Sequence, residues 1–63
     1  MPKYTVIIDW TDHDVLDADE FQVFASDPAA AIAAAKKRWR LSVAEWPGIR
    51  MRKVWLPSQA AQA

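Results

Sequence analysis

The apolar residues of this chain change periodicity twice, and these changes restrict the fold more than any other feature of the sequence. Residues 3–10 alternate, with Tyr4, Val6, Ile8 and Trp10 on one side, which predicts a strand, and a second strand is predicted over residues 20–25. Six alanines between residues 29 and 35, directly after a helix-start pair Asp-Pro, predict a helix. The alternation returns over residues 49–56, which predicts a third strand.

The end of the predicted helix has two possible positions. The helix could run to Trp46, or it could end near Leu41, because residues 42–45 (Ser-Val-Ala-Glu) have the pattern of a capping box for a further short turn. Pro47 and Gly48 end it in either case.

This order of elements predicts an α+β fold made of a single ββαβ domain. The first two strands form a hairpin, and a right-handed crossover through the helix brings the third strand beside the first. The simplest result is a three-stranded antiparallel sheet with strand order 2-1-3 and with the helix packed on one face. We expect the domain to span residues 1–56 and residues 57–63 to form a flexible tail.

The opposite face of this sheet has no predicted cover. Ile7, Phe24 and Val54 are expected there, ringed by polar residues that include Arg50 and Arg52. Ile49, Met51 and Trp55 are expected on the helix side. Lys53 interrupts the alternation, so a bulge or an edge position is expected in the third strand.

Size and composition limit the means by which this chain can be stabilised. Sixty-three residues form one small core, and no cysteine is present to form a disulfide or a thiolate metal site. One histidine cannot supply the usual zinc ligands. We therefore expect neither a metal nor a cofactor. We also expect a cytoplasmic chain without a membrane span. Its stability is expected to come from its four tryptophans or from self-association.

The charges are sorted by position along the chain. Residues 1–27 hold one base and seven acids, a net charge of −6, and residues 28–63 hold seven bases and one acid, a net charge of +6. One interpretation is that the two halves neutralise each other inside the fold, with Asp9 across a strand pair from Arg50 or Arg52. The other interpretation is that one half faces a partner.

The polar segment 11–20 is expected to form a long loop between the first two strands, close to the bases of residues 36–40. Val15 and Leu16 lie in the middle of it. They could form a docking tip, or they could fold back over the open end of the core.

The alternative function is nucleic-acid binding, because several basic residues lie close to an aromatic residue, Trp39, in the sequence. The basic residues of this nucleic-acid set are Lys36, Lys37, Arg40, Arg50 and Arg52. Trp39 falls on the core side of the predicted helix, and the chain lacks the net positive charge of a dedicated nucleic-acid module.

The preferred hypothesis is a small protein-binding module of the inhibitor or adaptor type, without catalysis, from a bacterium or a phage. Its partner is expected to be another protein or, more readily, a second copy of the chain in a homodimer. The candidate protein-binding residues are Ile7, Phe24, Val54, Arg50, Arg52, Val15 and Leu16.

Overall fold

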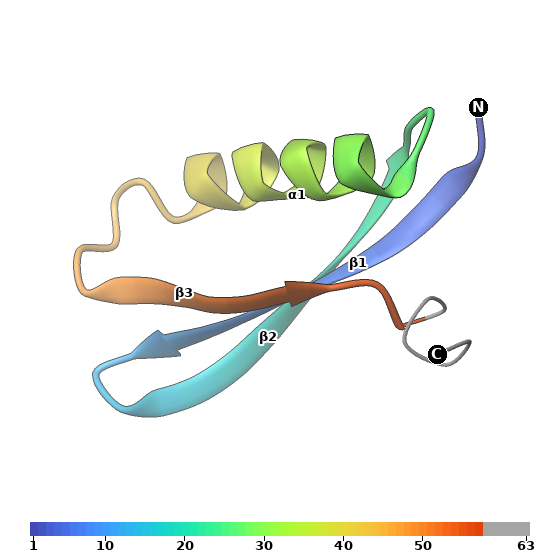
Figure 1. The fold of residues 1–63 in the computed structure, drawn as a ribbon. Coiled ribbons are helices and arrows are strands. Elements are labelled where there is room, and N and C mark those ends of the chain that lie inside the picture. Colours follow the sequence, from blue (N-terminus) through green and yellow to red (C-terminus); the bar gives the residue numbers. More distant parts are fainter. Residues whose placement is uncertain (58–63) are drawn as a thin grey trace.

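The computed structural model describes residues 1–57 and has the expected ββαβ order (Figure 1). Both strand pairs are antiparallel, and the sheet order is β2-β1-β3, so the predicted fold class is confirmed. Except for Pro57, the predicted tail lies outside the described residues. The elements are β1 (Lys3–Asp12), β2 (Val15–Phe24), α1 (Pro28–Ser42) and β3 (Ile49–Trp55).

The hairpin of β1 and β2 is longer and its turn tighter than the sequence predicts. All ten residues of β1 pair with β2, and only His13 and Asp14 form the turn. Both turn residues have a positive φ, 48° and 73°, as in the type I′ turns of two-residue hairpins. The predicted loop over residues 11–20 is therefore wrong. Pairing with the apolar strand β1 outweighs the weak strand propensity of the acidic residues in this segment.

The helix begins and ends at recognisable caps. The Asp27 carboxylate accepts a hydrogen bond from the Ala30 N–H at 2.8 Å, and Pro28 occupies the first helical position. At the other end the Val43 N–H and the Ser42 hydroxyl both donate to the Trp39 carbonyl, at 3.1 and 2.8 Å. Of the two predicted ends, the one near Leu41 is therefore the correct one.

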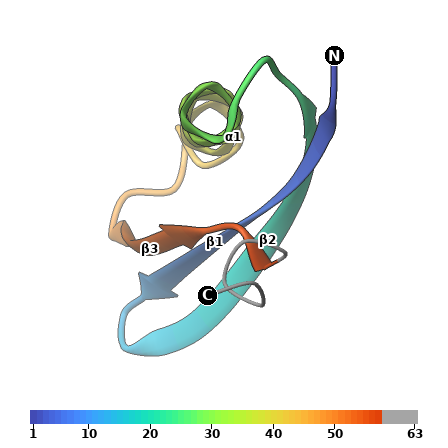
Figure 2. The ribbon, with the colours of Figure 1, turned by 45° about the vertical axis from the view of Figure 1, so that its right-hand side comes forward.

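The helix covers one face of the sheet, and the core lies between them (Figure 2). The expected inward residues of the first strand are confirmed, since Val6 and Ile8 are fully buried and Tyr4 and Trp10 pack against them. Trp39 is only 4% exposed, as its position on the core side of the helix predicts. The buried core residues are Val6, Ile8, Val23, Ala25, Ala31, Ala35, Trp39 and Leu56.

A bulge in β3 changes which of its side chains face the helix. Asp9 pairs with Lys53 but Trp10 pairs with Met51, so Arg52 is an extra residue in the ladder. Val54 consequently lies opposite the buried Ile8 and packs against the core, whereas the next residue, Trp55, lies opposite Ile7.

The predicted faces of Val54 and Trp55 are therefore wrong, and for one physical reason. Strict alternation assigns each residue the face of the residue two positions earlier, but one inserted residue reverses that assignment for everything beyond it. Val54 does not belong to the face opposite the helix, and Trp55 does.

Within residues 1–57, no helix combines the length and the apolar character that crossing a membrane requires.

Candidate binding site on the outer sheet face

The outer face is the side of the sheet opposite α1, and within the described part of the chain no helix or strand packs on it (Figure 2). The strand register assigns its residues, because side chains that pair across strands share a face. From β1 they are Lys3, Thr5, Ile7, Asp9 and Thr11, from β2 Leu16, Ala18, Glu20, Gln22 and Phe24, and from β3 Arg50, Lys53 and Trp55.

Apolar side chains occur along the whole length of the outer face. Phe24 is 66% exposed at one end of β2 and Leu16 is 70% exposed at the other. Ile7 and Trp55 pair across β1 and β3 in the middle of the face and are partly buried. The prediction that Ile7 and Phe24 face away from the helix is thus confirmed.

Hydrogen bonds between side chains fix the polar residues around this apolar centre. The Thr5 hydroxyl donates to Gln22 Oε1 at 3.0 Å, and Gln22 Nε2 donates to Glu20 Oε1 at 2.9 Å. These bonds hold the Glu20 carboxylate over β2.

A second group holds the indole of Trp55 in place. Trp55 Nε1 donates to Asp9 Oδ2 at 3.2 Å, and the Lys53 ammonium lies 5.3 Å from the centre of the Trp55 ring. The indole of Trp55 at the centre of the outer face therefore contacts both an acidic and a basic side chain.

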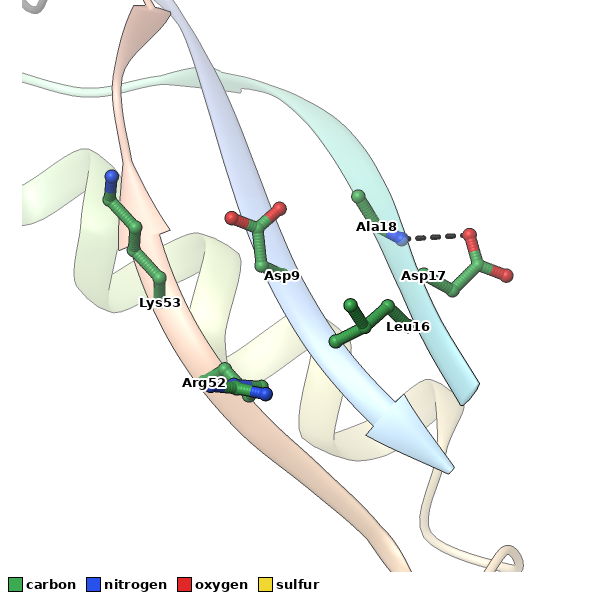
Figure 3. Close-up of a pocket in the computed structure, with 6 residues that line it drawn as sticks. All are labelled: Asp9, Leu16, Asp17, Ala18, Arg52 and Lys53. Atoms are coloured by element: carbon green, nitrogen blue, oxygen red, sulfur yellow. Dashed lines mark hydrogen bonds between the residues drawn. The ribbon is translucent and has the colours of Figure 1, made fainter. Parts of the chain in front are cut away.

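An open groove of about 600 Å³ crosses the outer face toward the hairpin turn. Figure 3 shows Asp9 between Lys53 and Leu16, with Arg52 on the neighbouring strand. The bulge explains why two consecutive bases line one groove, because an extra residue redirects a side chain that regular alternation would turn away. The groove is lined by Asp9, Leu16, Asp17, Ala18, Arg52 and Lys53.

The proposed docking tip does not exist as a single surface. Val15 and Leu16 are both exposed, at 64% and 70%, but they are consecutive residues of a strand and point to opposite faces. Leu16 belongs to the outer face and lines the groove. Val15 pairs with Asp12 on the side of the helix, and its exposure shows that it does not fold back over the core.

Within residues 1–57, the opposite charges of the two halves do not meet in ion pairs. Across residues 1–57 the one contact between a basic and an acidic side chain joins His13 Nδ1 to Asp12 Oδ1, at 2.6 Å. Asp9 lies across from Lys53, so its predicted position opposite Arg50 or Arg52 is wrong, because the bulge shifts the register.

The charges are instead separated onto the two edge strands. β2 carries three acids and no base, and β3 carries three bases and no acid. The acids are Asp17, Asp19 and Glu20, and the bases are Arg50, Arg52 and Lys53.

The structure divides the alternative nucleic-acid set between two sides of the molecule. Lys36, Lys37 and Arg40 lie on α1, whereas Arg50 pairs with Thr11 on the outer face and Arg52 lines the outer groove. Trp39 is buried and so cannot stack on a base. No single surface therefore holds all the residues of that set.

On β3, sequence reasoning missed Trp55 and Lys53 as outer-face residues, and on β2 it missed Glu20, which it placed at the end of a loop. The bulge or edge position expected from Lys53 is confirmed, since β3 is an edge strand with a bulge at Arg52, but the sequence pattern did not show that the faces of Val54 and Trp55 are reversed beyond it.

No family model, curated protein or solved structure matches the chain. The candidate binding site on the outer sheet face is therefore identified from the structure alone.

Proposed function

We propose that this chain is a small, non-catalytic protein-binding module that acts through its outer sheet face and associates with a second copy of itself. In this role it serves as an inhibitor or adaptor rather than as an enzyme. As a chain without cysteine, it is proposed to work in the cytoplasm.

One observation carries the proposal: Phe24, Leu16, Ile7 and Trp55 share a face on which no described helix or strand packs. Single exposed apolar residues are common on protein surfaces. Several on one face, with hydrogen-bonded polar groups beside them, have the composition of a protein interface.

The small core gives a physical reason for association. Eight residues are buried among those described, and three of them are alanines, which contribute little apolar area. Covering the outer face would remove two further aromatic side chains from water, and each large aromatic side chain can bury about 150–250 Å². Association would thus add stability that a chain of this size cannot obtain from its own interior.

The proposal is tested by sedimentation of the wild-type chain over a series of concentrations, together with the variant Phe24→Asp. We expect a monomer–dimer equilibrium in the wild type and a weaker one in the variant. Folding of the monomer should persist, because Phe24 is 66% exposed and does not belong to the core.

Leu41→Asp is the matched control. Leu41 is 71% exposed, like Phe24, but it lies on α1, on the opposite side of the sheet. The same chemical change there should leave association unaltered. Equal weakening by both substitutions, or a wild-type chain that stays monomeric at about 1 mM, where even weak dimers form, would contradict the proposal.

A further inference from the structure

We infer that the second copy packs face to face with a two-fold axis parallel to β1, so that β2 of each copy lies over β3 of the other. This inference rests on the proposed function and specifies the partner orientation at the same outer face.

The first argument is the charge of the two edge strands. On the outer face β3 carries the bases Arg50 and Lys53, with Arg52 in the groove, whereas β2 carries one acid, Glu20, and β1 lies between them. The other two acids of β2, Asp17 and Asp19, pair with helix-side residues of β1. Within the described residues none of these six side chains makes an ion pair. Each strand can therefore attract the opposite strand of a second copy.

The second argument is symmetry. A two-fold rotation about an axis along the central strand turns the outer face over and exchanges its two edges. Positions along β1 are unchanged by this rotation, so Asp9 lies over Asp9 of the second copy, and Lys53, which pairs with Asp9 on β3, offsets this repulsion in each copy. Glu20 pairs with Ile7, so it then lies over Trp55 of the second copy, which also pairs with Ile7. Lys53 of that copy lies two residues further along β3, at the level of Asp9.

A spacing of two residues along a strand is about 6.8 Å. Because packed sheets lie about 10 Å apart, the two backbones are separated by about 12 Å in all. The extended side chains of Glu20 and Lys53 can together span this distance, and the symmetry produces the contact twice. The natural twist of the two sheets would set their strands at about 30° to each other, as in other aligned sheet packings.

The alternative face-to-face arrangement is unfavourable on the same charges. A two-fold axis perpendicular to β1 would place β2 over β2 and β3 over β3. Glu20 would then lie over a strand that has no base, and the outward bases of β3 would lie over β3 of the second copy, where like charges that face each other are destabilising.

Pairing edge to edge is opposed by side chains that already occupy the free edge of β2. In an antiparallel edge strand every second residue directs its N–H and C=O away from the sheet. On β2 the Ala18 N–H donates to Asp17 Oδ1 at 2.7 Å, and the Gln22 carbonyl accepts from Arg38 Nη1 at 3.1 Å.

Ala18 and Gln22 are both among the β2 residues whose backbone groups point away from β1. Both hydrogen bonds therefore occupy backbone groups that an added strand would need. Arg38 is itself held over the Phe21 ring, at 5.6 Å from its centre. A β2-to-β3 edge pairing would also be head to tail, and it would produce open chains rather than a closed dimer.

The test reverses one charge on each strand. Glu20→Lys should raise the dimer dissociation constant about tenfold or more, because it changes two symmetry-related contacts from attraction to repulsion. Asp19→Lys is the matched control: it makes the same change on the neighbouring residue of β2, whose side chain pairs with Ile8 on the helix side. This control should change the dissociation constant less than about threefold, since its charge lies away from the interface.

The decisive measurement is rescue. Lys53→Glu should also weaken the homodimer, but an equal mixture of Glu20→Lys and Lys53→Glu should form a heterodimer of about wild-type affinity. The chain with both substitutions should recover the homodimer. Sedimentation measures each affinity, and circular dichroism checks that each variant is folded.

Each outcome has a definite meaning. Rescue in the mixture supports the arrangement in which β2 lies over β3. A dimer that Phe24→Asp breaks, but that shows no rescue, overturns this orientation and leaves the proposed function in place. A wild-type chain without any dimer overturns both, and assemblies longer than a dimer overturn the face-to-face packing.

Discussion

Ile7 and Ile8 are the same residue type at consecutive positions of β1, yet they belong to opposite faces of the sheet. Ile8 is fully buried beneath α1, whereas Ile7 is only partly buried, between Glu20 and Trp55 on the outer face. The face toward the helix is a closed core. The outer face combines apolar, acidic and basic side chains that no described element covers, and this difference separates the residues that maintain the fold from those available for binding.

The largest expected effect comes from truncating these two isoleucines. Ile8→Ala should lower the free energy of unfolding by about 2–5 kcal/mol, because it leaves a cavity in the core. Ile7→Ala should cost about 1 kcal/mol, because less apolar area is buried there. Denaturant titration at a concentration at which the chain is monomeric measures both, and equal losses would mean that the two faces do not differ as described.

The next effect tests which face Val54 occupies. Val54→Lys should destabilise the fold by about 1–3 kcal/mol, because it places a charge opposite the buried Ile8. Val15→Lys is the matched control, since Val15 is 64% exposed at the start of the other edge strand. The control should change stability by less than about 0.5 kcal/mol.

The melting temperatures of the two variants, measured by circular dichroism, distinguish two placements of Val54: toward the helix, as in the structure, or outward, as strict alternation predicts. If Val54→Lys is as harmless as Val15→Lys, then β3 has no bulge and Val54 points outward.

The smallest effect concerns the turn that fixes the register of the hairpin, and with it the face of every residue on β2. Asp14 has a φ of 73°, a conformation that glycine adopts without steric cost. Asp14→Gly should therefore stabilise the chain by about 0.5 kcal/mol.

Ala18→Gly, in the middle of β2, is the comparison for that substitution and should destabilise the chain by about 0.5–1 kcal/mol. Thermal unfolding of both variants decides the matter. Destabilisation by Asp14→Gly would show that this turn does not have the left-handed backbone described above.

Much of the fold follows from local sequence patterns. The alternation from Tyr4 to Trp10 identifies the inward side of β1, and Asp27-Pro28 identifies the start of α1. The order of elements then gives the sheet order 2-1-3, because the handedness of the crossover leaves few other possibilities. The same patterns placed Ile7 and Phe24 on the outer face.

The rest of the candidate site could not be obtained in this way. The acidic stretch of β2 has poor strand propensity, and only its pairing with β1 makes it a strand. The inward turn of Val54 and the outward turn of Trp55 follow from one bulge, whose position depends on how β3 fits against β1 and the helix.

By itself, therefore, the sequence determined the type and order of the elements, the inner faces of β1 and β2, and the sorting of charge along the chain. The tertiary structure decided the register, the bulge and the separation of acids and bases onto opposite edges of one sheet. The physical reason is range: periodicity and capping act within a few residues, whereas strand register is set by residues that are far apart in the chain.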